Sequence, residues 1–279
     1  MDGKALAERV RAEVADDVRE LGELGLATVL VGDDPASQIY IDLKHKAARE
    51  VGIVTRDYRL AADTTEAELL EQVSQLNEDD AIDGVLVQLP LPNGIDEARV
   101  IREIAPVKDV DGLHPFNAGQ LFLGRLTHVG ATPVGIMSLL TEYDVPLEGA
   151  RTVVVGRSDI VGKPMSLLLL HANATVAICH SRTRDLGSVT RDADVLVVAV
   201  GQYGVVGPDD VRPGATVIDV GMNRSDEGLR GDVDQAVSEV AGLLTPVPGG
   251  VGPMTIATLL QSTVRAARYR RGLLAFPGG

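Results

Sequence analysis

Two side chains one helical turn apart, Tyr40 and Lys44, form the first pair in this sequence that could do chemistry. They lie in a segment whose pattern predicts a helix over residues 36–50, and residues four apart share a helix face. A phenol beside an amine can orient the amine and assist proton transfer. Spacing alone favours the plainer interpretation, because most lysines on helices are only solvated.

A polar amide, Gln88, ends the otherwise apolar run that begins at Gly84. Functional residues gather where the strands of an α/β sheet end, so Gln88 is a candidate site residue. The segment Lys108-Asp109-Val110-Asp111-Gly112 follows as a turn-like loop. Its two carboxylates are expected to be ordinary solvated turn residues.

A segment rich in proline and glycine, residues 245–255, precedes a helix predicted over 254–271. Proline fixes the backbone and glycine lets the chain pass close to another surface, so the segment is a rigid loop with few side chains. It could connect two domains or hold a ligand at a helix N-terminus. Composition alone leaves both interpretations open.

A second loop of this kind follows the apolar run Val153-Val154-Val155. Gly156, Arg157 and Ser158 form its turn, and a helix is predicted to begin near Pro164. A strand, a glycine turn and a helix N-terminus together can bind a dinucleotide pyrophosphate. The spacing departs from the general G-x-G-x-x-G fingerprint, so the signal lies in the context.

The next strand predicts which dinucleotide would bind. NAD sites place an acidic residue after this strand, but here the strand leads into His180-Ser181-Arg182-Thr183, without a carboxylate. Arg157, Ser158, Ser181 and Arg182 are donors suited to a 2′-phosphate, which favours NADP over NAD. Each could instead be a solvated loop residue.

Two glycines follow later strands, Gly201 after 195–200 and Gly221 after 215–220. In an open α/β sheet, glycines at these ends would let the backbone approach a cofactor. Ordinary turn glycines are the competing explanation, and for Gly221 the sequence does not decide between the two.

Composition bounds the class of protein. A chain of 279 residues with 45% hydrophobic residues can form one large or two ordinary domains, and a net charge of −14 argues against a nucleic-acid partner. One cysteine excludes an internal disulfide or a cysteine zinc cluster, and we expect no metal. Without a secretory pattern or an apolar run long enough to span a bilayer, a cytoplasmic protein with no membrane partner is expected.

Apolar strand-like runs alternate with amphipathic stretches, which predicts an α/β protein with parallel sheets covered by helices. We expect two domains: an N-terminal α/β catalytic domain at 1–128 plus 254–279, and a Rossmann-like NADP-binding domain at 129–253. The C-terminal helix is expected to pack back on the first domain. The predicted strands are 27–31, 53–60, 84–88, 152–156, 174–179, 195–200 and 215–220.

Five motifs occur in this chain in the order seen in the bifunctional methylenetetrahydrofolate dehydrogenase/cyclohydrolase family, which the sequence resembles over nearly its whole length. They are Tyr40 to Lys44, Val87 to Leu91, Lys108 to Gly112, Gly156 to Ser158 with Val161 to Pro164, and Pro246 to Thr255. The resemblance implies a folate cleft between two domains. It also implies NADP-dependent oxidation of 5,10-methylenetetrahydrofolate to the methenyl compound and hydrolysis to 10-formyltetrahydrofolate, which serves one-carbon metabolism and purine precursor supply.

The resemblance also implies residue roles. Lys44 would be the central residue of hydration, Tyr40 would position it and the folate, and Gln88 would hydrogen-bond to it. Asp111 would hold the pterin edge. Further folate contacts would come from Leu89, Gly250, Val251, Gly252 and Pro253.

Two departures from the family pattern concern the cofactor half. Ala131 stands where many relatives carry cysteine, which matters little if Thr132 supplies the polar contact, and Gln202-Tyr203-Gly204 replaces the usual Gln-Pro. A homodimer is expected from the resemblance. One alternative is a dehydrogenase without the hydrolase activity, with NADP or NAD as its cofactor. The other is a catalytically silent NADP-binding sensor, which would leave Tyr40, Lys44, Gln88 and Asp111 unexplained.

Overall fold

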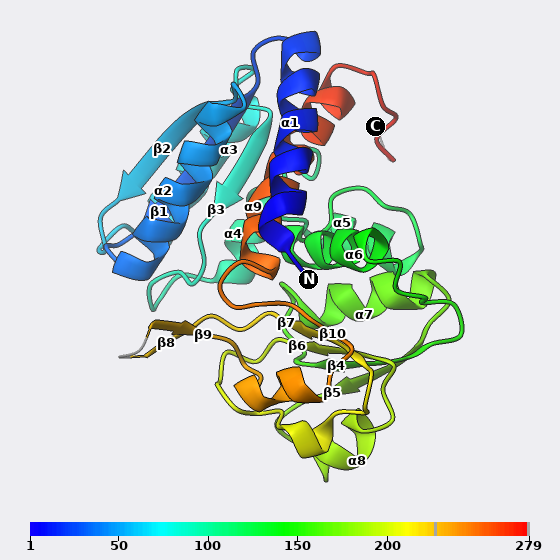
Figure 1. The fold of residues 1–279 in the computed structure, drawn as a ribbon. Coiled ribbons are helices and arrows are strands. Elements are labelled where there is room, and N and C mark those ends of the chain that lie inside the picture. Colours follow the sequence, from blue (N-terminus) through cyan, green and yellow to red (C-terminus); the bar gives the residue numbers. More distant parts are fainter. Residues whose placement is uncertain (226–227, 278–279) are drawn as a thin grey trace. The chain divides into compact units, whose positions relative to one another are not determined.

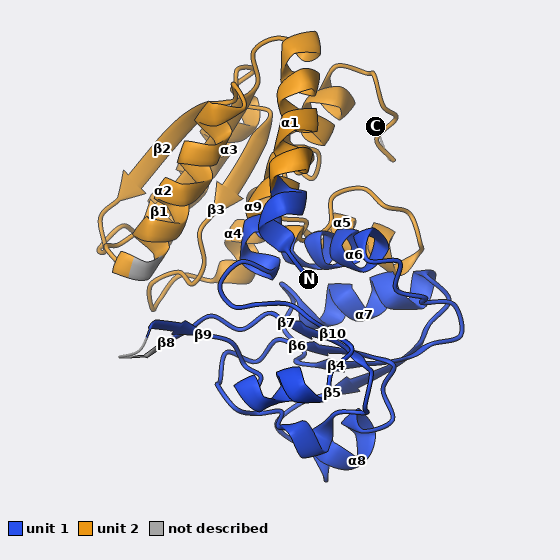
Figure 2. Ribbon diagram, viewed as in Figure 1, with its two compact units in different colours: residues 1–7, 132–255 blue, residues 8–131, 256–279 orange. Residues whose placement is uncertain are grey.

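The computed structural model describes residues 1–225 and 228–277 (Figure 1). The chain forms two compact units, which Figure 2 shows in different colours. Unit 1 comprises Met1–Ala7 and Thr132–Thr255, and unit 2 comprises Glu8–Ala131 and Ile256–Gly279. The predicted class, two α/β domains with parallel sheets, is confirmed. The predicted domains, a folate-binding domain at 1–128 plus 254–279 and an NADP-binding domain at 129–253, remain a prediction.

Unit 2 is built on a parallel sheet with the strand order β2-β1-β3 (Figure 1). A bridge between Val85 and Asp109 extends this sheet beyond β3. Its elements are β1 Gly25–Val31, α2 Pro35–Glu50, β2 Val54–Leu60, α3 Glu66–Glu78, β3 Gly84–Val87, α4 Glu97–Glu103 and α5 Pro115–Phe122, with most of α1 Gly3–Leu21 and of α9 Val251–Arg270.

Both faces of this sheet are covered, which explains why β1 is buried at every position. Leu26 of β1 packs in a cluster with Val18 of α1 and Leu260 of α9, whereas Val29 packs in a second cluster with Val73 of α3. Successive strand side chains point to opposite faces, so one strand joins both clusters. The packing of residues 256–270 of α9 confirms that the C-terminal helix belongs to the core of the first domain.

Unit 1 is built on a five-stranded parallel sheet with the order β10-β7-β6-β4-β5. The chain enters at β4, adds β5 on one side and then crosses to β6 on the other, which is the doubly wound arrangement. Its elements are α6 Ala131–Glu142, β4 Arg151–Val155, α7 Gly162–His171, β5 Thr175–Cys179, α8 Leu186–Thr190, β6 Val195–Val198, η1 Pro208–Asp210, β7 Thr216–Asp219, β8 Asn223–Ser225, β9 Gly228–Arg230, η2 Gln235–Glu239 and β10 Leu243–Leu244.

All seven predicted strands are present, with ends displaced by one or two residues. Helix α9 begins at Val251, three residues earlier than expected. Pro253 does not prevent this start, because the first N–H groups of a helix have no partner within the helix and proline there loses no hydrogen bond.

Local capping fixes the helix that carries the candidate lysine. Asp34 precedes α2 and its carboxylate accepts a 2.8 Å hydrogen bond from the N–H of Ser37, with Pro35 in the first turn. The helix ends before Gly52, whose φ of 88° is in the left-handed region that glycine tolerates. The register of α2, and therefore the face that carries Lys44, is set at both ends.

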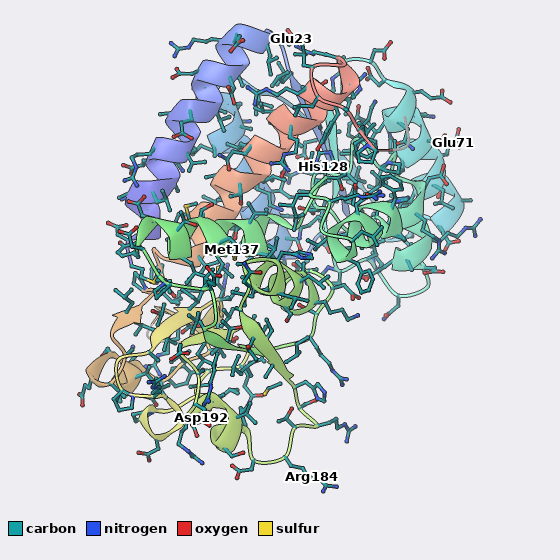
Figure 3. All side chains as sticks on the ribbon, turned by 90° about the vertical axis from the view of Figure 1, so that its right-hand side faces the viewer. Glu23, Glu71, His128, Met137, Arg184 and Asp192 are labelled. Carbon is teal, nitrogen blue, oxygen red and sulfur yellow. The ribbon has the colours of Figure 1, made fainter. Side chains whose placement is uncertain are left out.

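One buried histidine, His128, makes unit 2 sensitive to acid. It lies beside α9 (Figure 3), edge-on to the Tyr269 ring, with its Nε2 2.9 Å from the carbonyl oxygen of Val107. Its Nδ1 has no hydrogen-bond partner among the described residues. Burial lowers the pKa of His128 to about 4, below the ordinary value of 6.5.

The pH dependence follows from this lowered pKa. Between pH 6.5 and 4 the unfolded chain binds a proton at residue 128 that the folded chain does not, so acid lowers the free energy of unfolding. We expect the free energy of unfolding of His128→Gln to fall by about 2–3 kcal/mol less between pH 6.5 and 4 than that of the unaltered protein. Urea titrations at a series of pH values measure this difference. The matched control His171→Gln, at an exposed position, should keep the slope of the unaltered protein. Equal slopes in the protein and in His128→Gln would contradict the assignment.

Candidate active site

The lysine predicted from spacing is buried. Lys44 is only 8% exposed, and its Nζ donates a 3.2 Å hydrogen bond to Oε1 of Gln88 and lies 5.8 Å from the centroid of the Tyr40 ring. Solvated lysine, the plainer interpretation, is therefore wrong here. Helix α2 presents Tyr40 and Lys44 on the face that meets the end of β3, which brings the two predicted residues and Gln88 together.

Gln88 is fixed by the strand that it follows. Its backbone N–H donates to the carbonyl oxygen of Val29 at 2.8 Å, which continues the ladder between β3 and β1 by one residue. Its side-chain Nε2 donates to the carbonyl oxygen of Leu89 at 2.8 Å, so Oε1 is left facing Lys44. Leu89 thus contacts the site through its backbone, and it precedes a cis peptide bond to Pro90.

The segment 108–112 differs from its expected solvated state. Asp109 is 1% exposed and accepts hydrogen bonds from the N–H groups of Leu113 and His114 and from Nδ2 of Asn117. Burial raises the pKa of Asp109 to about 6. The buried Lys108 donates to two carbonyl oxygens at the end of α3. Both side chains shape the loop that carries Asp111.

Asp111 lies two residues beyond the bridge that joins Asp109 to Val85. Parallel strands end at one edge of a sheet, so Asp111 and Gln88 emerge from neighbouring positions. Burial lowers the pKa of Lys44, an effect that the negative charge of Asp111 partly opposes. Burial likewise raises the pKa of Asp111, opposed by the positive charge of Lys44. The two groups therefore sense each other electrostatically.

This arrangement can supply a base. An amine that is removed from water loses its proton more readily, and its hydrogen-bond partner Gln88 is uncharged and cannot hold the ammonium form as a carboxylate would. The lone pair of a neutral Lys44 can then accept a proton. Tyr40, whose pKa burial raises, stays a neutral phenol beside it.

Sequence reasoning missed a role for His45, the neighbour of Lys44. His45 is 5% exposed, and its Nε2 lies 2.7 Å from Oγ1 of Thr28 on β1. The contact ties the sheet-facing side of α2 to β1 and helps to fix the helix. The only sequence signal for this contact is a polar residue next to the candidate lysine. No sequence pattern predicts that such a residue will reach a buried threonine on a neighbouring strand.

In unit 1 the predicted turn follows β4. Gly156 has a φ of 131°, and a side chain there would overlap the carbonyl group of Ala199. The hydroxyl of Ser158 accepts hydrogen bonds from the N–H groups of Val161 and Gly162, at the start of α7. Arg157, next in the turn, is exposed. The turn is thus pre-shaped, and its arginine is available to a ligand.

The turn after β5 adjoins the turn after β4. Val155 pairs with Cys179, and the N–H of Gly156 donates to the carbonyl oxygen of Cys179 at 2.9 Å. Ser181 and Arg182 follow immediately and are exposed, and the N–H of Arg182 donates to Nδ1 of His180. These exposed donors at one sheet edge fit a phosphate bound beside an adenosine ribose.

Glycine is required at positions 201 and 221 for different structural reasons. Gly201 has a φ of 69° and open space where a side chain would begin. Gly221 has no such space, because a side chain would overlap the backbone and carboxylate of Asp232. The close approach that requires glycine at 221 is therefore made by the protein's own chain.

The remaining predicted residues lie in the loop 245–255 and next to it in unit 1. Oγ1 of Thr132 is 3.0 Å from Oγ1 of Thr255. The N–H of Gly250 donates to the carbonyl oxygen of Pro246 at 2.8 Å, and a side chain at Gly250 would press on Thr245 and Pro246. At Gly252 the space for a side chain is ordinary. Val251, Gly252 and Pro253 form the first turn of α9.

Residues 1–225 and 228–277 contain no group of three or more acidic, histidine or cysteine side chains that could hold a metal ion. Nor does any helix there have the length and apolar character needed to cross a membrane.

A doubly wound sheet whose first strand runs through a glycine turn into a helix is the architecture of dinucleotide-dependent enzymes. The structure therefore defines the class: a two-domain α/β protein with one unit of this type. Comparison with known families is more specific. The chain belongs to the tetrahydrofolate dehydrogenase/cyclohydrolase family, whose catalytic-domain model matches residues 1–111 and whose NAD(P)-binding-domain model matches residues 130–271. The resemblance inferred from the motifs is confirmed.

Individual relatives match over almost the full chain. The chain is 56% identical over 274 residues to "Bifunctional protein FolD 2" of Frankia alni, covering 96% of this chain and 95% of that protein. It is similar in structure to the bifunctional FolD methylenetetrahydrofolate dehydrogenase/cyclohydrolase of Campylobacter jejuni, with a TM-score of 0.94, 46% identity and coverage of 96% and 98%. The Trypanosoma brucei FolD, solved with NADP cofactor and inhibitor, matches with a TM-score of 0.92, 38% identity and coverage of 99% and 98%.

Proposed function

We propose that this protein catalyses two consecutive reactions of one-carbon metabolism. The first oxidises 5,10-methylenetetrahydrofolate to 5,10-methenyltetrahydrofolate with NADP, and the second hydrolyses the methenyl compound to 10-formyltetrahydrofolate. The single observation that carries the proposal is the buried Lys44, held by the neutral amide of Gln88 and facing the charge of Asp111. Relatives named as bifunctional FolD proteins over nearly the full chain support it.

We further propose a division of labour. Residues 1–128 with 254–279 act as the folate-binding catalytic domain, and residues 129–253 act as the NADP-binding domain. Leu89, Gly250, Val251, Gly252 and Pro253 contact the folate. These assignments extend the family's catalytic and NAD(P)-binding divisions to individual residues of this chain.

Oxidation leaves positive charge on the substrate, and this sets a condition on the site. The methylene carbon loses a hydride, and bound NADP supplies the hydride acceptor. A permanent ammonium beside the resulting methenyl cation would raise its energy, whereas a neutral Lys44 does not. Asp111 holds the pterin edge, where a carboxylate accepts hydrogen bonds from a ring N–H and an exocyclic amine.

Hydrolysis uses the same lysine as a base. Water adds through its oxygen to the methenyl carbon and gives one proton to Lys44. The bond from this carbon to N5 then breaks, N5 takes up the second proton of the water, and the proton on Lys44 passes to solvent. Gln88 keeps Nζ oriented through this cycle, and Tyr40 positions Lys44 and the folate ring.

The preference for NADP rests on the donors at the ends of β4 and β5. Gly156 lets the turn approach, Arg157 and Arg182 supply positive charge, and Ser158 and Ser181 supply hydroxyl groups. The five residues directly after β5, His180 to Arg184, include no carboxylate that would repel a 2′-phosphate. Thr132, Gly201 and Gly221 complete the proposed cofactor site, and Gly221 belongs to it by its place after β7, although the contact that requires glycine there is with Asp232.

The proposal also includes a homodimer in the cytoplasm that binds tetrahydrofolate derivatives and neither nucleic acid nor membrane. The net charge of −14 supports the absence of a nucleic-acid partner, because a phosphate backbone requires a basic face.

The role of Lys44 predicts a split between the two activities. We expect Lys44→Met to lower the rate of methenyl hydrolysis by at least about 100-fold, because no other group replaces the base. Hydride transfer, which needs no base at this position, should fall less. The measurements are methenyl absorbance decay and NADPH formation. Lys46→Met is the matched control, because Lys46 lies on the same helix with its side chain 71% exposed, and it should keep both rates.

Full hydrolysis by Lys44→Met would contradict the assigned chemistry. If the unaltered protein oxidises the substrate but does not hydrolyse the methenyl compound, it is a dehydrogenase without the second activity. If the unaltered protein shows neither activity but still binds NADP, it is a sensor.

The role of Arg157 predicts a change of cofactor preference. Loss of one charge-assisted phosphate contact should lower kcat/KM for NADP by about 10–100-fold and leave the value for NAD nearly unchanged in Arg157→Ala. Arg151→Ala alters an exposed arginine at the opposite end of the same strand and should change neither value. An equal loss with NADP and NAD would show that Arg157 does not read the 2′-phosphate.

A further inference from the structure

Two buried aspartates in unit 1, Asp219 and Asp232, take no part in the chemistry described above. Asp219 ends β7 and is 5% exposed, and Asp232 follows β9 and is fully buried. Buried carboxylates are costly unless hydrogen bonds replace their water. Here the carboxylates accept hydrogen bonds mainly from backbone N–H groups, which lie in the segments that follow β6, β7 and β9.

Asp232 holds the turn after β6. Its Oδ2 accepts hydrogen bonds from the N–H groups of Val200 at 2.6 Å and Gly201 at 2.9 Å, and its Oδ1 accepts from Nδ2 of Asn223 at 2.8 Å. Its backbone carbonyl accepts from the N–H of Val205 at 3.0 Å. One residue therefore fixes both ends of the turn 200–205.

Asp219 in turn holds Asp232. Its Oδ1 accepts from the N–H of Asp232 at 2.7 Å and from that of Gly221 at 3.0 Å, and its Oδ2 accepts from the N–H of Val233 at 3.1 Å. Gly231 and Gly221 make this proximity possible, because a side chain at Gly231 would overlap the Asp219 carboxylate and one at Gly221 would overlap Asp232. The two aspartates form a chain of hydrogen bonds from β7 to the turn after β6.

A second contact joins the same hairpin to the same turn. The guanidinium carbon of Arg230, on β9, lies 5.1 Å from the centroid of the Tyr203 ring. Tyr203 belongs to the Gln-Tyr-Gly segment that departs from the family pattern. The turn is thus supported from its inner side by Asp232 and at its tip by Arg230.

The outer side of this turn is open. Val200 is 39% exposed, and nothing lies within 4 Å of the point where a side chain of Gly201 would begin. In a doubly wound sheet a dinucleotide crosses at the switch point between β4 and β6, with its adenosine on the β4–β5 side. The other half, the nicotinamide nucleoside, then falls on the side of β6 and β7, where this turn lies.

We propose that Asp232 is a positioning residue for the nicotinamide half of the cofactor: it fixes the backbone of Val200 and Gly201 from behind, and Asp219 holds it in place. This inference rests on the proposed function, which supplies the cofactor. The proposal predicts a selective effect, since within residues 1–225 and 228–277 Asp232 makes no hydrogen bond to the turns after β4 and β5, which face the adenosine half.

The test compares two ligands on three variants. Asp232→Asn keeps the shape of the side chain but removes its charge and one acceptor, so we expect NADP to bind about tenfold more weakly. Binding of 2′,5′-ADP, which lacks the nicotinamide half, should stay within about twofold. Asp219→Asn should act in the same direction. Asp194→Asn is the control. Asp194 lies at the other end of β6, where the strand begins, and its carboxylate accepts a hydrogen bond from the N–H of Arg151.

Two further readouts separate positioning from general damage. In the cofactor-free protein, the Val200 and Gly201 amides should exchange hydrogen faster in Asp232→Asn than in the unaltered protein. Methenyl hydrolysis, assigned to residues of unit 2, should be retained. If Asp232→Asn does not fold, Asn223→Ala, which removes the donor to Oδ1 of Asp232 and to the carbonyl oxygen of Gly231 but keeps the carboxylate, should show a smaller effect with the same selectivity.

Equal weakening of NADP and 2′,5′-ADP would overturn the inference, and so would unchanged binding of both. Failure of the unaltered protein to bind NADP would instead contradict the proposed function, so the two failures are distinguishable.

Discussion

The burial of one ammonium group against a neutral amide is the interaction on which the site depends. Lys44 reaches Gln88 at 3.2 Å in surroundings that lower its pKa, with Asp111 as the opposing charge. A carboxylate in place of Gln88 would stabilise the charged lysine and remove the base. The arrangement instead favours a lysine that can take up and release a proton, and it avoids a permanent positive charge where the substrate becomes a cation.

The scaffold places its polar groups by one rule, applied in each unit. Gln88 follows β3, Arg157 follows β4 by one turn residue and Ser181 follows β5, so functional side chains emerge where parallel strands end. Buried polar residues then fix the backbone at these ends. Asp109 does this for the loop that carries Asp111 in unit 2, and Asp232 does it for the turn after β6 in unit 1. Preorganised positions require such support.

The sequence predicted the helix face of Tyr40 and Lys44, the end of β3 at Gln88 and the turn at Gly156, because local periodicity and turn residues determine these features. It could not predict the burial of Lys44, since the groups that enclose a side chain come from distant segments. The same limit made Lys108 and Asp109 look like solvated turn residues, although they are 3% and 1% exposed. Gly221 remained undecided because its close neighbour, Asp232, is eleven residues away in the chain.

The protonation state of Lys44 tests the central claim most directly. The chain has only five lysines, so the side-chain signals of a protein labelled with ¹³C-lysine are few, and the Lys44→Met spectrum identifies the one from residue 44. A titration followed by NMR should show this signal changing well below the ordinary lysine pKa of about 10.4. A Lys44 signal that titrates at or above that value would contradict the account, because the lysine would then be a fixed cation and no base.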